Sequence, residues 1–170
     1  AFVTLSFAPA TITEPDDPVA VDIVVDGLDV ATGGFSLELD FDNLTFVDYV
    51  VGGPGATLGP FPLDLSFGDL GGTVSLNALA DIIPEADLYA AQNSGGPFTL
   101  ARVNFTGITP GQFTLRLRDV ALSDYGGNGL VVCTDAACVD PNPVPEPMTP
   151  LLVAASLGAL ALARRRRRAA

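Results

Sequence analysis

The chain has 170 residues, of which 20 are acidic and 8 basic, and it contains no histidine. Every basic residue is an arginine, and most of them stand in one block near the end of the sequence. A body this acidic repels nucleic acid, because binding to phosphates needs clustered cations. The lack of histidine removes the commonest general base and metal ligand, and with them the Ser-His and Cys-His nucleophile systems.

Apolar and polar residues alternate with a period of two along most of the chain before residue 134, which is the pattern of half-buried strands. Residues 2–8 and 19–27 are the first such segments. The clearest is 35–42, where the apolar residues are expected to face the core and the polar ones solvent: Phe35, Leu37, Leu39 and Phe41 against Ser36, Glu38, Asp40 and Asp42.

Residues 113–120 repeat this pattern, with Phe113, Leu115 and Leu117 expected inside and Arg116 and Arg118 outside. Further strands are predicted in the segments LTFVDYV, LDLSF, TVSLNAL, FTLARVNF and GLVVC. Turns rich in glycine and proline separate these segments. About nine short strands with no long helical pattern predict an all-β sandwich. A helix of about two turns is expected over residues 84–93, because proline suits a first helical turn.

Several residues suggest ligands, and each also has a purely structural interpretation. Three acidic clusters offer oxygen ligands for calcium, although none has the spacing of an EF-hand loop and each is also a typical solvated turn: Asp16-Asp17, Asp40-Asp42-Asn43 and Asp124-Asn128. Tyr49, Tyr89 and Tyr125 are either a sugar-stacking platform or edge packing. We expect no catalytic residue, no required cofactor and no structural metal, with calcium left open.

Cys133 and Cys138 are the two cysteines of the chain. Their spacing fits neither a CxxC redox motif nor a set of zinc ligands. In an oxidising compartment we expect them to form a small disulfide loop, whereas in a reducing cell they would stay thiols.

The end of the chain has a different composition. Residues 140–147 contain four prolines and predict an extended linker, which places the end of the folded domain at residue 139. Residues 147–163 carry no charge, and a helix of this length spans about 26 Å of a hydrocarbon core of about 30 Å. They predict a transmembrane helix over residues 148–163. The basic tail, residues 164–170, is then cytoplasmic, and its orienting residues are Arg164, Arg165, Arg166, Arg167 and Arg168.

The order VPEP, apolar run and RRRRR resembles the PEP-CTERM sorting signal of bacteria. The resemblance covers residues 144–168. It implies that the exported precursor is held in the inner membrane by its tail, with the domain in the periplasm, and is then processed toward the cell surface by exosortase. It also implies a bacterium that makes exopolysaccharide and grows in biofilms. The implied recognition residues are Val144, Pro145, Glu146 and Pro147. An exported domain needs a signal peptide, which we expect to have been removed before Ala1.

The body resembles cohesin-like domains in two stretches. Residues 18–52 contain a strand followed by the pattern F-x-L-x-L-x-F-D, and residues 100–124 contain a strand, a Pro-Gly turn and another strand. This resemblance implies a jelly-roll β-sandwich related to some carbohydrate-binding modules. The best-known members of the family bind dockerin through one sheet face, but the sequence does not indicate which face that would be here.

These observations favour a non-enzymatic surface or extracellular-matrix protein, which exosortase sorts. A carbohydrate-binding or adhesive module and a self-assembling subunit of a surface filament or layer are the alternatives, and a glycoside hydrolase built on paired carboxylates is the fourth. The expected partners are exosortase, the inner membrane and either exopolysaccharide or further copies of the chain.

Overall fold

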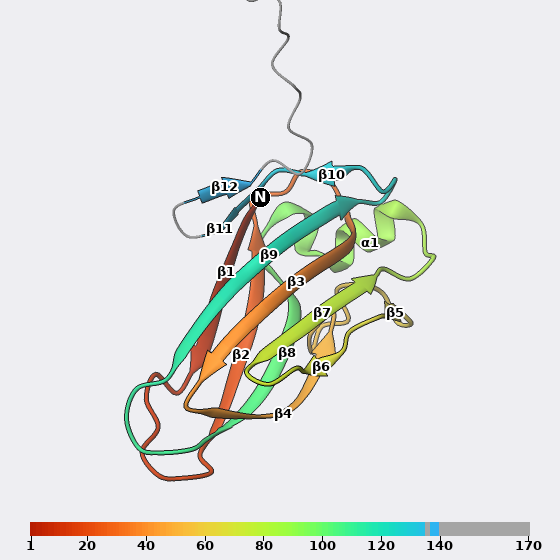
Figure 1. The fold of residues 1–170 in the computed structure, drawn as a ribbon. Coiled ribbons are helices and arrows are strands. Elements are labelled where there is room, and N and C mark those ends of the chain that lie inside the picture. Colours follow the sequence, from red (N-terminus) through yellow and green to blue (C-terminus); the bar gives the residue numbers. More distant parts are fainter. Residues whose placement is uncertain (135–136, 140–170) are drawn as a thin grey trace, which may run out of the picture.

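The structure of the chain is a computed structural model, which describes residues 1–134 and 137–139. These residues form a two-layer β-sandwich with one short helix at the end where the chain begins (Figure 1). The predicted all-β sandwich is therefore confirmed. The part of the chain that the structure describes forms twelve strands rather than about nine, because five of them have only two or three residues.

The first sheet has the strand order β12-β11-β1-β2-β8-β4. Its strands pair antiparallel, except that β1 and β11 run parallel. The bounds of its strands are β1 (Phe2–Ala8), β2 (Pro18–Asp26), β4 (Leu44–Val51), β8 (Phe98–Gly107), β11 (Val132–Thr134) and β12 (Ala137–Val139).

The second sheet has the order β10-β9-β3-β7-β5, and β6 also pairs with β7. All its pairings are antiparallel. The bounds of its strands are β3 (Thr32–Asp42), β5 (Leu63–Asp64), β6 (Gly68–Asp69), β7 (Thr73–Leu79), β9 (Thr114–Asp124) and β10 (Gly129–Leu130). The segment GLVVC is thus not one strand as predicted, because the chain crosses at Val131 from the second sheet to the first.

The core lies between the sheets and is built from the alternating apolar residues. Val21 and Ile23 of β2 are fully buried, as are Leu39 of β3 and Leu76 of β7. The predicted inward face of residues 35–42 is confirmed, with Phe41 only half-buried near the end of its strand. Phe105 of β8 is the largest fully buried side chain among the described residues, and its ring packs against Phe41 across the sandwich with centroids 4.9 Å apart.

The predicted helix is present as α1 (Glu85–Ala91), which Pro84 precedes and a short 3₁₀ turn, Asn93–Gly95, follows. Leu88 is its buried residue. Within the described ranges no helix is long and apolar enough to cross a membrane. The predicted linker, transmembrane helix and basic tail, residues 140–170, lie outside the described residues.

Candidate functional site

Each sheet presents an outer face to solvent, and the two outer faces differ in composition. On the first sheet, Arg102 forms a two-pronged ion pair with Asp22 of the neighbouring strand, with both N–O distances 2.7 Å. On the second sheet, charged, small and apolar side chains occupy separate zones of one surface. We call this surface the β9–β3–β7 face; it consists of the outward side chains of β9, β3 and β7 and of the segment 61–67 beside β7.

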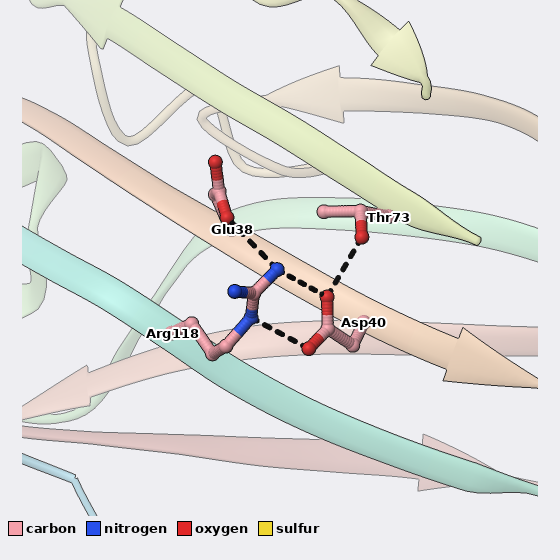
Figure 2. A network of polar contacts seen from close by, with 4 residues as sticks. All are labelled: Glu38, Asp40, Thr73 and Arg118. Carbon is pink, nitrogen blue, oxygen red and sulfur yellow. Dashed lines mark hydrogen bonds and ion pairs between the residues drawn. The ribbon is translucent and has the colours of Figure 1, made fainter. Parts of the chain in front are cut away.

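Four residues from three strands form a charged cluster on the β9–β3–β7 face (Figure 2). The guanidinium of Arg118 on β9 donates to Asp40 on β3, with Nε 2.6 Å from Oδ2 and Nη2 2.8 Å from Oδ1. Its Nη2 also lies 3.1 Å from a carboxylate oxygen of Glu38. Thr73 of β7 donates its hydroxyl to the same Asp40 carboxylate at 2.7 Å. These bonds fix a flat guanidinium at the surface of the sheet.

The cluster also sets the ionisation of its members. The hydrogen bond from Arg118, followed by the one from Thr73, holds the pKa of Asp40 below its ordinary value of 3.8. Asp40 in turn raises the pKa of the Arg118 guanidinium. Arg116 lies two residues before Arg118 on β9. It is exposed and has no ion pair among the described residues. Arg116 therefore presents a positive charge without an ion pair on this face, whereas Asp40 and Glu38 compensate the charge of Arg118.

A shallow hollow of about 220 Å³ lies beside the charged cluster on the same face. We call it the Gly34 groove, and its outward lining residues are Gly34, Ser36, Asn77, Leu79, Ala121 and Ser123. Gly34 matters here because a Cβ at this position would lie 2.7 Å from Cδ2 of Leu79 and 3.2 Å from Oγ of Ser123. Any larger residue would displace Leu79 and fill the hollow.

An apolar strip borders the face on the side of β7. Its members are Phe61, Leu63, Leu65 and Phe67, and their exposed fractions are 81%, 55%, 46% and 75%. Leu63 pairs with Leu79, whereas Leu65 and Phe67 donate their backbone N–H groups to Asn77 and Ser75, so the segment runs antiparallel along β7. The sequence predicts one strand over residues 63–67, and its length is wrong: only Leu63–Asp64 and Gly68–Asp69 are strand.

The polar residues of this segment explain why its apolar side chains face solvent. Burial raises the pKa of the Tyr49 phenol on β4, and hydrogen bonding to Asp64 raises it further. Ser66 also bonds to the Tyr49 hydroxyl, and its Oγ exchanges hydrogen bonds with the backbone of Asn77. Because Asp64 and Ser66 are held on the side of β4 and β7, the alternating side chains of the apolar strip face solvent.

Two of the acidic clusters that the sequence offers for calcium contain a carboxylate that braces its own loop. Asp17 accepts three hydrogen bonds from Thr13 and Glu14, and the Thr13 hydroxyl contributes most to lowering its pKa. Asp124 likewise accepts from the side chain and backbone of Asn128, and its pKa is lowered. No group of three potential metal ligands gathers anywhere in residues 1–134 and 137–139.

The other predicted ligand groups are also dispersed. Asp40 belongs to the charged cluster, while the Asn43 amide bonds to the backbone of Thr109 and Gln112 in a different loop. The three tyrosines come from β4, α1 and the turn after β9, and share no ring contact. Tyr125 donates its hydroxyl to the carbonyl of Ile83 at 2.8 Å. They do not form a sugar-stacking platform.

The carboxyl groups with perturbed pKa values are unsuited to acid catalysis. A glycosidase needs a carboxylic acid whose pKa is raised so that it can protonate the leaving oxygen. In the described part of the chain, the carboxyl groups with a resolved shift are Asp17, Asp40 and Asp124, and every shift is downward. These groups stay ionised at neutral pH, so they favour binding over proton donation.

The remaining predicted site residues stand as follows. Cys133 of β11 lies directly opposite Cys138 of β12 in the antiparallel register, and the disulfide between them stays a prediction. The sorting motif, Val144 to Pro147, and the arginine block, Arg164 to Arg168, lie outside the described residues. The Gly34 groove and the apolar strip were not expected from the sequence, because each depends on which strands become neighbours.

No protein-family model matches the chain, and neither does any curated protein. Solved structures do match it. A type II cohesin of Acetivibrio cellulolyticus, solved in a cohesin–X-dockerin complex, is similar with a TM-score of 0.60 and 14% identity over 81% of this chain and 97% of the other. A non-cellulosomal cohesin of the archaeon Archaeoglobus fulgidus is similar with a TM-score of 0.54 and 19% identity over 78% and 84%.

A type II cohesin of Bacteroides cellulosolvens is similar over 82% of this chain and 98% of its own, with a TM-score of 0.59 and 16% identity. Identities this low establish shared architecture and not shared activity. The body of the chain is therefore a cohesin-like β-sandwich, as its two sequence stretches predict.

Proposed function

We propose that this chain is a non-enzymatic surface module that recognises a protein partner through the β9–β3–β7 face. The observation that carries the proposal is the grouping on one face of a fixed guanidinium, a glycine-floored groove and four exposed apolar side chains. Protein interfaces have this composition, with apolar and aromatic residues and arginine at the centre and polar groups around them. A sheet face held by backbone pairing also needs little reordering when it binds.

The structural neighbours support a protein as the class of partner. One of them was solved as a cohesin–X-dockerin complex, in which the cohesin-like sandwich is assembled with another protein. We extend to this chain only the general property, which is adhesion between proteins outside the cell. The residues that would give this chain its own specificity are Arg116, Arg118 and the lining of the Gly34 groove.

The proposal has a second part that concerns delivery. Exosortase would recognise residues 144–147 while residues 148–163 hold the precursor in the inner membrane, and the mature domain would reach the cell surface or the extracellular matrix, in association with exopolysaccharide or a biofilm. The order of VPEP, apolar run and arginine block supports this part. The extended Pro-rich linker would keep the motif accessible to a membrane protease.

One pair of matched substitutions tests the binding part. Ala121→Arg places a long cation in the Gly34 groove, whereas Ala20→Arg makes the same change on β2, at the outer face of the first sheet. Both full-length variants should reach the surface equally. Chemical cross-linking on intact cells should then yield a cross-linked protein for the parent and for Ala20→Arg, with at least about a tenfold loss for Ala121→Arg. Equal yields from the two variants would refute a role for this face.

A second pair tests delivery. Replacing Pro145, Glu146 and Pro147 by alanine should leave the protein exported and membrane-bound but unprocessed, as judged by fractionation and immunoblotting for size. Replacing Pro141 and Pro143 by alanine is the control, because it changes the linker outside the triplet. Normal processing of the triplet variant in cells that contain exosortase would mean that residues 145–147 act only as a spacer and not as a recognition motif.

A further inference from the structure

The outward residues of the second sheet form three rows that run across the strands. Pairing of β9, β3 and β7 aligns Arg118, Glu38 and Ser75, and the N–H of Phe67 donates to Ser75 at the far end of that row. The next row runs from Ala121 through Ser36 and Asn77 to Leu65. The third row runs from Ser123 through Gly34 and Leu79 to Leu63. One edge of the face thus carries the ion-paired Arg118 and the hollow, and the opposite edge carries exposed apolar side chains.

These rows make the face complementary to itself. A two-fold axis that lies in the plane of the face and parallel to the strands exchanges the two edges but keeps each row at its own level. From this geometry we propose that the occupant of the apolar strip is a second copy of this chain, docked face to face. The inference deepens the proposed function, on which it rests, because it names the partner of the same face.

Each row then brings together groups that suit one another. Phe67 of one copy meets Arg118 of the other, and a guanidinium over an aromatic ring is a favourable contact. Leu65 meets the small side chain of Ala121, and Leu63 meets Ser123 and the hollow above Gly34. The outward side chains of the strip carry no charge, so the approach of a second acidic body is least unfavourable along this edge.

The exposed rings supply a substantial part of the area of a specific contact. A phenylalanine buries about 150–250 Å², so Phe61 and Phe67 at their observed exposures of 81% and 75% supply roughly 250–400 Å² from each copy. Two copies would thus gain roughly 500–800 Å² from four rings, out of about 1,200–2,000 Å² in a standard interface. Leu63 and Leu65, which are 55% and 46% exposed, add to this area.

Pairing of strand edges is a less suitable mode for this segment. The backbone N–H of Ser66 is bonded to Oδ1 of Asp64 at 2.9 Å, and Oδ1 of Asp69 accepts from the N–H groups of Gly71 and Gly72. These side chains occupy backbone donors that an added strand would need. The segment is therefore suited to contact through its side chains.

A charge-pair exchange between two differently tagged full-length chains tests the inference in cells. Leu65→Asp in one chain and Ala121→Arg in the other should each, when present in both copies, lower the recovery of the second tag after surface cross-linking by about tenfold. Co-expression of the Leu65→Asp chain with the Ala121→Arg chain should restore recovery, because one half of the interface gains an Asp–Arg pair and the other half remains native. In the control, Ala20→Arg replaces Ala121→Arg, so one half of the interface is native but the Asp–Arg pair is absent, and recovery should stay below that of the exchanged pair.

Leu65 and Ala121 are exposed, so we expect both substituted chains to fold. Resistance of each surface-displayed variant to proteolysis checks that they do. Cross-linking of two parental copies that neither substitution affects, or failure of the exchanged pair to recover, would overturn the inference. Recovery of a different protein, lost with Ala121→Arg, would also overturn it while leaving the proposed function in place. If neither Leu65→Asp nor Ala121→Arg changes the recovery of any cross-linked protein, both this inference and the proposed function are rejected.

Discussion

Replacement of Gln92 should destabilise the body more than replacement of a typical, exposed polar residue. Gln92 follows α1 and is 1% exposed. Its side-chain oxygen accepts from the backbone N–H of Thr32 at 2.7 Å, and its side-chain nitrogen donates to the Thr32 carbonyl at 2.8 Å. The amide thereby imitates a paired strand residue, and it satisfies both backbone groups at the start of β3, where Thr32 is itself fully buried. Gln92→Met keeps most of the volume and removes both hydrogen bonds.

The expected cost follows from the two orphaned groups. A buried donor or acceptor that loses its partner costs about 1–3 kcal/mol, so the two groups together cost about 2–6 kcal/mol. This is a large part of the about 5–15 kcal/mol that stabilises an ordinary domain. Gln92→Glu should be at least as damaging, because a carboxylate can accept from Thr32 N–H but cannot donate to its carbonyl, and its charge would be buried.

Urea unfolding followed by circular dichroism measures this cost in a shortened chain that ends at Asp140. Gln112 is the other glutamine of the chain and its side chain is exposed, so Gln112→Met is the matched control, with an expected change within about 0.5 kcal/mol. The Gln92→Met midpoint should fall by about 1 M urea or more. A change below about 1 kcal/mol at Gln92 would mean that water replaces the amide, and the account of buried pairing would be rejected.

Three further predictions concern the whole body. The shortened chain ending at Asp140 should stay soluble and melt cooperatively with a β-rich spectrum, and aggregation would mean that residues beyond 140 complete the fold. The pair Cys133→Ser and Cys138→Ser should lower stability by at most about 2 kcal/mol, since the closed loop is short, and mass spectrometry finding two thiols in surface protein would contradict the disulfide. The pKa of Asp40 in the folded protein is lowered from 3.8, so its ionised carboxylate contributes to the free energy of unfolding above about pH 4. This contribution is lost as the pH falls through the folded pKa. The Asp40→Asn variant should therefore lose less stability on acidification than the parent.

Alternation of residue types was sufficient to place most of the long strands and their faces. In residues 35–42 large apolar side chains alternate with charged or hydroxyl side chains. The strand is therefore far more stable with its apolar face toward the core than with its polar face there. The helix at residues 84–93 was also predictable, because Pro84 and the acidic first turn are local signals. Such signals act between residues that are close in sequence.

Features that depend on partners far apart in sequence were not predictable in this way. Gln92 and Thr32 are 60 positions apart, and the local sequence around neither residue indicates that they pair. The Gly34 groove depends on Ala121 of β9 and Leu79 of β7 lying on either side of β3. The charged cluster is intermediate: the sequence indicates that Asp40 and Arg118 face outward, but only the register shows that they meet.

In the apolar strip, alternation predicts the period of the segment but does not show which side chains face solvent. In FPLDLSF the apolar positions would normally turn inward, because burying a leucine or phenylalanine stabilises a fold by about 1.5–3 kcal/mol each. Here Leu79 of β7 already faces outward, since its neighbour Ala78 is in the core, and the antiparallel pairing of Leu63 with Leu79 forces Leu63 onto the same outer side. Tyr49 then takes up Asp64 and Ser66 on the opposite side. Leaving four large side chains in water is unfavourable for an isolated chain, and a partner that covers them removes that cost. The strip is for this reason the feature of the body that most directly indicates association.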